Sequence, residues 1–446
     1  MLVIAYFAFS VLVAVALVLH FTLKKFTDDQ IVINNPAFLA FQKKYFSVYF
    51  LALLAEWLQA PYLYKLYSFY GFIDTQIAVI YISGFVSSVL FGTYTGFLAD
   101  AWGRKKVCVL FTILYSICCT SKLSRTYSVL VSGRVLGGIS TSLLFSSFDA
   151  WYVHEHSQTH QFPPEWIQLT FTKATIFNST IAILAGLVAN FASEWLGFGP
   201  ASPFVLAIPF LIIAGIMIQC CWNENYGKKG KILKPCGESL RLILTDRKIF
   251  VTGAVQALFE SVMYIFVFLW TPVLEPARPP LGIVFSCFMA CILIGSKIFD
   301  YLNLRKLRVT IIISVVIYGA MIANIAASFA SANHPRLTFV IFLIMELLCG
   351  IYFPAVGKLR YYTLPEAHHS GILNWFRVPL NAIAAIVLLA LHDTHSPHGI
   401  TALFALCAVL LCLAGLASIF LHRIVNEERQ SEDETTLFTE QSAPIL

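Results

Sequence analysis

Charged residues are scarce in this chain. Asp, Glu, Lys and Arg make up 12% of its 446 residues, whereas hydrophobic residues make up 58%. A soluble globular domain carries about twice that share of charge. Apolar runs recur along nearly the whole length, and the mean hydropathy is +0.77. This composition excludes an ordinary soluble domain and predicts an all-α polytopic membrane protein.

Motifs of metal binding and catalysis are also absent. None of the 11 cysteines forms a C-x-x-C pair, so we expect neither a zinc site nor an outer disulfide. No predicted span carries H-E-x-x-H, a serine elbow or a nucleotide-binding loop. The net charge of +6 is too diluted to indicate a nucleic-acid partner. We therefore expect no enzyme, no cofactor and no metal.

Thirteen segments are each long enough to cross a hydrocarbon core of about 30 Å. We predict helices at about 1–22, 38–66, 75–99, 107–123, 127–152, 166–194, 200–222, 248–274, 280–301, 308–331, 336–357, 369–392 and 399–424. The first segment has no Lys or Arg before its apolar stretch and no small-x-small cleavage site at its end. We favour a retained helix there over a signal peptide.

The most informative stretch is GFLADAWGRKK at residues 96–106, between two apolar runs. Gly96 is expected to let two membrane helices approach, and Asp100 to cap a helix or pair with Arg104. Together with Gly103, these residues predict a tight turn that serves in gating. Glu155, at the end of the helix near 127–152, is expected to complete a latch with Arg104.

The pattern G-x-x-x-D-x-x-G-R-K-K resembles the signature loop between helices 2 and 3 of the major facilitator superfamily of secondary transporters. The resemblance implies two six-helix halves. Of the 30 lysines and arginines, twenty-one lie in predicted loops on the side of this turn and five on the other side, which predicts that the turn is cytoplasmic. The expected parts are an extra helix at 1–22, a first half at 37–222, a cytoplasmic linker loop at 223–247, a second half at 248–424 and a disordered acidic tail at 425–446.

Among the charged residues inside predicted spans, six lie at places that echo each other between the halves: Glu56, Arg134, Lys173, Glu260, Glu346 and Arg377. Ionised groups are costly in lipid, so such residues usually face the interior or a wet cavity. Two hypotheses remain open: these residues bind a substrate, or they form internal ion pairs that hold the halves together.

Three of these residues are basic, which suits an anionic substrate. Arg377 is the first candidate, because a guanidinium grips oxyanions by two-point contacts, with Arg134 and Lys173 as helpers. The acids would keep the empty cavity near neutral, and one of them could take up a proton for coupling. Gln59 and Tyr62 either donate hydrogen bonds to the substrate or anchor the helix at the interface.

Several longer runs carry a closer resemblance: APYLYKLY at 60–67, FDAWY at 148–152, FVFLWTPV at 266–273 and LNWFRVPL at 373–380. They resemble the molybdate-anion transporters of animals, relatives of the algal and plant type-2 molybdate transporters. The resemblance implies uptake of molybdate across the plasma membrane. Sulfate and tungstate, also tetrahedral dianions, remain alternatives, and so does a sensor or scaffold that binds an anion without cycling.

Overall fold

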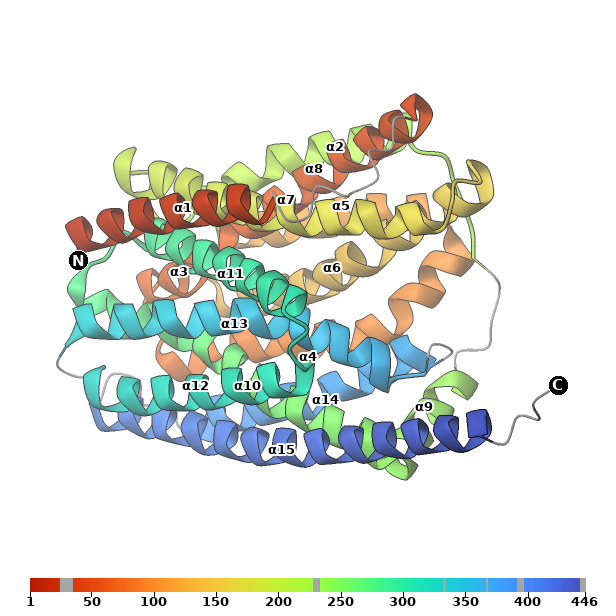
Figure 1. Ribbon diagram of the computed structural model, residues 1–446. Helices are drawn as coiled ribbons and strands as arrows, with labels where there is room; N and C mark the ends of the chain where they lie inside the picture. Colours follow the sequence, from red (N-terminus) through yellow and green to blue (C-terminus); the bar gives the residue numbers. More distant parts are fainter. Residues whose placement is uncertain (25–34, 228–232, 332–333, 366–367, 391–396, 442–446) are drawn as a thin grey trace.

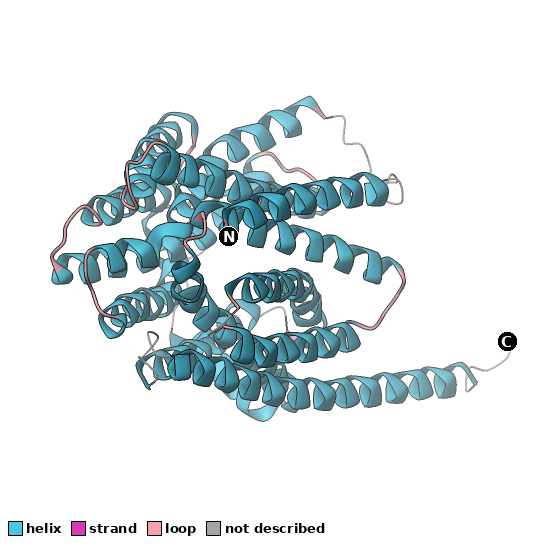
Figure 2. Ribbon diagram, turned by 90° about the vertical axis from the view of Figure 1, so that its left-hand side faces the viewer, coloured by secondary structure: helices cyan, strands magenta, loops and turns pink. Residues whose placement is uncertain are grey.

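The computed structural model describes residues 1–24, 35–227, 233–331, 334–365, 368–390 and 397–441. Within these ranges the chain forms helices and short loops and no strand (Figure 2). The longer helices run roughly along one common direction (Figure 1). They are α1 (Leu2–Lys24), α2 (Pro36–Gln59), α3 (Leu63–Phe69), α4 (Asp74–Trp102), α5 (Arg104–Ser121), α6 (Tyr127–His154), α7 (Glu165–Asn190), α8 (Ser202–Cys221), α9 (Leu233–Thr245), α10 (Arg247–Leu274), α11 (Leu281–Leu304), α12 (Val309–Ala330), α13 (Pro335–Thr363), α14 (His369–Ala390) and α15 (Pro397–Gln441).

Helices α2 to α8 pack mainly on one another, and we call them the first group. Local chemistry sets the limits of α2. The Asn35 side chain accepts hydrogen bonds from the first-turn amides, and Pro36 occupies the first helical position, where a missing N–H costs nothing. At the other end, Pro61 cannot donate a hydrogen bond to the preceding turn, so the helix tightens into a short 3-10 turn before α3. The continuous helix predicted at 38–66 is therefore broken.

Helices α10 to α15 form the second group, which meets the first along α7–α11 and α4–α14. Two glycines make the α7–α11 crossing close. A Cβ at Gly282 would lie only 2.3 Å from the carbonyl oxygen of Gly186, so no side chain fits at this crossing. Helix α1 lies outside both groups and packs on α11, where the Cys287 thiol donates to the carbonyl oxygen of Ala5.

Among the described residues, eleven helices are long and apolar enough to cross a membrane. Helices α2 and α5 are not among them, although the sequence predicts spans there. Both carry clustered charge: Lys43 and Lys44 lie in α2, and α5 begins with Arg104, Lys105 and Lys106. The chain is thus a multi-pass membrane protein with these eleven candidate spans.

The structure differs from the sequence prediction in the linker and the tail. Residues 233–245 form α9, which packs on α10 and α14 through Leu242 and Ile243 against Ile372 and Phe376. Helix α15 continues to Gln441, over most of the segment predicted to be disordered. The two termini lie at opposite ends of the bundle (Figure 1). We call the end with Gly103 the signature face and the end with Lys65 and Glu275 the opposite face.

Candidate functional site

The turn between α4 and α5 consists of a single residue, Gly103, with φ +115°. A Cβ there would lie 2.6 Å from the carboxyl carbon of Glu224, so both conformation and space require glycine. Arg104 starts α5 and pairs with Asp100 at 2.7 Å. The expected tight turn and the expected ion pair are both present.

The segment that follows α8 closes over this turn. Asn225 accepts a hydrogen bond from the Arg104 amide and donates its side-chain amide to Glu155 at 3.0 Å. The Glu224 carboxylate accepts from the Lys105 amide at 2.9 Å, and Trp222 stacks on Trp151 with ring centroids 3.7 Å apart. The role of this segment was not predictable from the sequence, because its contacts join residues about 70 to 120 positions apart.

Two predictions about the turn are wrong in this structure. Glu155 does not pair with Arg104; Asn225 lies against Glu155 instead, and Arg104 is held by Asp100. Gly96 does not bring two helices together, because it is exposed and a Cβ there would have no atom within 4 Å. The close approach occurs nearer the opposite face, where a Cβ at Gly138 would lie 2.2 Å from the Gly84 carbonyl oxygen.

The three predicted basic residues lie at different depths. Arg134 packs against Gly84 of α4, whereas Arg377 lies beside Gly92 of the same helix. Eight residues of α-helix correspond to about 12 Å. Lys173 donates to Gln42 at 3.2 Å. The three bases therefore do not form one compact anion cluster.

Arg134 is held within the first group. Its guanidinium lies over the ring of Tyr81, 5.6 Å from the centroid, and its buried Nε has no hydrogen-bond partner among the described residues. Glu56 is close enough to interact electrostatically with Arg134, and it accepts a hydrogen bond from Thr141 at 3.2 Å. These contacts favour a mainly structural role for Arg134.

Arg377 is exposed and lies where the two groups meet. A Cβ placed on Gly92 would be 3.8 Å from Arg377 Nη1 and 3.6 Å from the Ser142 hydroxyl oxygen. No described residue accepts a hydrogen bond from this guanidinium, although it interacts electrostatically with Glu260. A guanidinium beside a hydroxyl, with its donors free, is suited to bind an oxyanion.

The acids of the second group differ from each other in their partners. Glu260 pairs with Arg360 of α13 at 3.0 Å, and Gln256 accepts from the same guanidinium at 3.0 Å. The helix predicted at 336–357 ends before Arg360, whereas α13 continues for six more residues to Thr363 and includes it. Glu346 is buried and has no cationic partner among the residues that the structure describes. Outside the spans, partial burial and the nearby Arg360 lower the pKa of the His369 imidazole.

Gln59 and Tyr62 are both buried and bonded within the protein. Gln59 donates to the Ala55 carbonyl oxygen at 3.1 Å, and the Tyr62 hydroxyl lies 3.5 Å from side-chain oxygens of Asn190 and Glu194. In this conformation neither side chain is free to bind a substrate, which favours the anchoring hypothesis.

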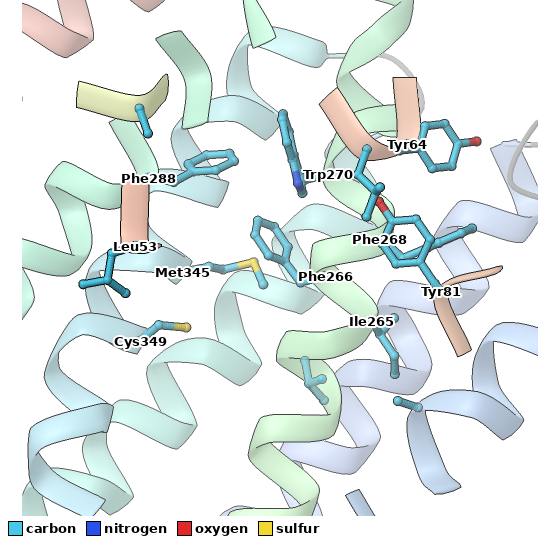
Figure 3. Packing of buried hydrophobic residues seen from close by; sticks show 14 of the residues in the cluster. Leu53, Tyr64, Tyr81, Ile265, Phe266, Phe268, Trp270, Phe288, Met345 and Cys349 are labelled. Carbon is cyan, nitrogen blue, oxygen red and sulfur yellow. The ribbon is translucent and has the colours of Figure 1, made fainter. Parts of the chain in front are cut away.

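The two groups are closed together on the opposite face. Lys65 of α3 forms an ion pair with Glu275, which follows α10. Tyr64 and Tyr81 from the first group both meet the Phe268 ring edge-on, with centroids 5.4 Å apart in each case (Figure 3). Among the described residues, the hydrogen bonds, ion pair and ring contacts between the groups all lie in this half of the bundle.

Known proteins with similar sequences show the family to which this chain belongs. The Molybdate-anion transporter of Xenopus tropicalis is 45% identical over 451 residues, covering 100% of this chain and 99% of the relative. That of Danio rerio is 42% identical and covers 95% and 96% of the two chains. The chain belongs to the molybdate-anion transporter family. This confirms the resemblance seen in the sequence and places the chain among transporters, not enzymes.

Other comparisons agree at the level of the fold. Residues 4–338 of this family member match a profile described as sugar transporters with 12 TM. Among solved structures, a POT family transporter in complex with 5-aminolevulinic acid superposes with a TM-score of 0.72 at 13% identity, covering 89% of this chain and 98% of the other. The nucleoside transporter NupG gives 0.67 at 12% identity over 86% and 99%. The fold is that of the major facilitator superfamily.

Proposed function

We propose that this protein carries molybdate, a tetrahedral oxyanion, into the cell across the plasma membrane by alternating access. The names of its relatives supply the substrate. The main observation in support of the site is that Arg377 is exposed at the junction of the two groups and that no described side chain or carbonyl accepts a hydrogen bond from its guanidinium. The neighbouring Ser142 hydroxyl donates to the Ser88 carbonyl oxygen at 2.9 Å, so the guanidinium is the donor that this place offers an anion. Glu260, which could have neutralised Arg377, pairs with Arg360 instead.

We also propose the topology predicted from the loop charges: thirteen spans, with the amino terminus outside and the signature face in the cytoplasm. Residues 37–222 and 248–424 are then the two halves that rock against each other, and the structure is an inward-facing state. Termini at opposite ends of the bundle support an odd number of spans. Epitope tags probed in intact and permeabilised cells test the topology. An amino-terminal tag that reacts only after permeabilisation would contradict it.

Uptake of a dianion needs an energy source. Moving two negative charges into a cell against an interior-negative potential of 100 mV costs about 4.6 kcal/mol. We propose protons as the coupling ion, because the spans hold carboxyl groups at Glu56, Glu260 and Glu346.

The decisive experiment measures molybdate uptake into proteoliposomes by mass detection, with sulfate and tungstate as competitors. Uptake above that of empty vesicles, competed weakly by sulfate, is the expected result. Equal competition by sulfate would favour a general oxyanion carrier. Saturable binding to the purified protein without uptake would instead favour the sensor or scaffold.

A further inference from the structure

Glu346 lies in a small cavity inside the second group. Its residue exposure is 6%, and the cavity is walled by α10, α12, α13 and α15. Apart from Asn324, the other lining side chains are apolar or weakly polar, with Phe266 and Met345 among them (Figure 3). The free space is about 10 Å³, at the lower limit for a single water molecule. The carboxyl group is therefore almost entirely removed from solvent.

Two hydrogen-bond acceptors in this cavity lack a donor. Glu346 Oε2 and Asn324 Oδ1 are both buried without a partner in the described part of the chain. The Asn324 amide nitrogen donates one of its two hydrogens to the Ala320 carbonyl oxygen at 2.9 Å, and Glu346 Oε2 receives no hydrogen bond from it. A proton on Glu346 would supply the missing donor. An ionised carboxylate would instead leave two unsatisfied acceptors and a bare charge.

In the described part of the chain, no cationic group compensates the charge of an ionised Glu346. The titratable groups with which it interacts electrostatically are two thiols, Cys291 on α11 and Cys349 on α13 itself. The cavity residues from α10, α12 and α15 include no titratable side chain. Three other acids of the helices differ, since Glu260 pairs with Arg360, Glu56 lies near Arg134 and Asp149 accepts a hydrogen bond from the Tyr45 hydroxyl at 2.9 Å. A sodium ion would need more oxygen ligands and more space than the cavity provides.

We propose that Glu346 is the proton-carrying residue that couples transport to the proton gradient. The inference rests on the proposed transport function and assigns its coupling ion to one carboxyl group. The carboxylate takes one proton from water on the outer side, crosses the cycle as a neutral acid, and returns the proton to water on the cytoplasmic side. Between Glu346 and Arg360, α13 contains Pro354, which cannot donate to the Gly350 carbonyl oxygen and gives the helix a place to bend.

The test uses the full-length protein in proteoliposomes and two assays. The first measures molybdate uptake with and without an outside-acid pH gradient. The second measures exchange of internal for external molybdate at equal pH, which needs no net proton release. Glu346→Gln keeps the shape of the side chain and adds a permanent donor. We expect it to abolish the stimulation by the gradient and to keep exchange within about twofold of wild type, since an amide avoids the buried-acceptor cost.

Glu165→Gln is the matched control, because it removes an exposed carboxyl group at the start of α7. It should keep both activities. Gradient stimulation that persists in Glu346→Gln would overturn the proposal. So would wild-type uptake that ignores the gradient, although that result would leave molybdate transport itself intact. Absence of wild-type uptake and exchange would overturn the proposed function and the coupling proposal with it.

If Glu346→Gln loses exchange as well, infrared difference spectra of the purified wild-type protein decide. A protonated-carboxyl band that changes when molybdate is added, and that is missing from the variant, supports the proposal. A band that stays constant identifies a purely structural acid and overturns it.

Discussion

Arg134 in the first group and Arg377 in the second group occupy different kinds of environment. Arg134 is packed between α4 and α6, with its guanidinium over Tyr81 and its side chain against Gly84. Arg377 is exposed, beside Gly92 and Ser142, and no described residue accepts a hydrogen bond from its guanidinium. The same residue type is half-buried among protein contacts in one group and exposed in the other.

This difference separates structure from binding. A guanidinium that is enclosed has already exchanged water for protein contacts, and an anion would have to displace them. An exposed guanidinium at the junction of the two groups can gain an anion without such a loss. This difference supports the proposal that Arg377 binds the substrate, and it predicts which substitutions affect folding and which affect transport.

The largest effect is expected for Arg377→Ala, which should reduce molybdate uptake to background at an unchanged surface level. Arg377→Lys keeps the charge but loses the two-point fork, and should weaken molybdate affinity by roughly tenfold, about 1.4 kcal/mol. Uptake and surface labelling in the same cells test both variants. Arg305→Ala, at the exposed end of α11, is the control.

The rival account makes Arg377 a structural partner of Glu260. It predicts that Arg377→Ala misfolds and that adding Glu260→Gln restores surface level and uptake together. Recovery of uptake in the double variant would remove Arg377 from the binding site.

Alanine substitutions at Gly138 and Gly92 test the difference between the surroundings of Arg134 and those of Arg377. At Gly138 the new Cβ would meet the Gly84 carbonyl oxygen at 2.2 Å, so Gly138→Ala should destabilise the protein by about 1–3 kcal/mol. At Gly92 the contacts would be 3.6 and 3.8 Å, so Gly92→Ala should fold normally. Its methyl group would stand between Arg377 and Ser142, and we expect a several-fold rise in KM for molybdate.

Thermal unfolding and uptake kinetics measure the two effects separately. Gly357→Ala, where a Cβ would have no atom within 4 Å, is the control. A Gly92→Ala variant with wild-type KM would show that molybdate binds elsewhere.

A smaller effect is expected for Asp100→Asn, which removes the ion pair with Arg104 at the signature turn. About 0.5 kcal/mol is typical of such a partly exposed pair, so exchange should slow about two- to threefold while molybdate binding is retained. Exchange rates and equilibrium binding on the same preparation provide the measurement. An unchanged exchange rate would show that the pair does not control the cycle.

The smallest effect is expected on the opposite face. Lys65→Met breaks the half-exposed ion pair with Glu275 and should shift the population toward the outward-facing state by at most about fivefold. The distance between spin labels at the exposed residues Phe69 and Arg278 reports this shift. Glu275→Gln should reproduce it, and a lack of shift in both variants would mean that the aromatic contacts with Phe268 alone close this face.

Much of this architecture follows from the sequence. The apolar runs predict most of the helices, because a stretch of some twenty apolar residues has few stable arrangements other than a span. The turn at Gly103 and the Asp100–Arg104 pair were also predictable, since both depend on residues within a few positions of each other. The break at Pro61 was signalled by the proline itself, although the predicted helix ran through it.

Partners across long distances in the chain were not predictable. Glu155 bonds to Asn225 and not to Arg104, and Glu260 pairs with Arg360, a residue 100 positions away. Charges at matching places in the two halves also differ in their surroundings. Lys173 and Arg377 match in the pattern, yet Lys173 donates to Gln42 at 3.2 Å, whereas no described residue accepts a hydrogen bond from the Arg377 guanidinium.

The sequence by itself determined that this is a helical membrane transporter of the molybdate-anion family, because hydropathy and local motifs act within single segments. Only the tertiary structure decided which charges are enclosed, which are paired and which remain available. Those properties depend on distances between helices that are far apart in the chain. A Cβ added at Gly138 would clash with the Gly84 carbonyl oxygen, whereas a Cβ added at Gly92 would lie at ordinary contact distance from Arg377. Such differences in spacing decide which charged side chains an anion can reach.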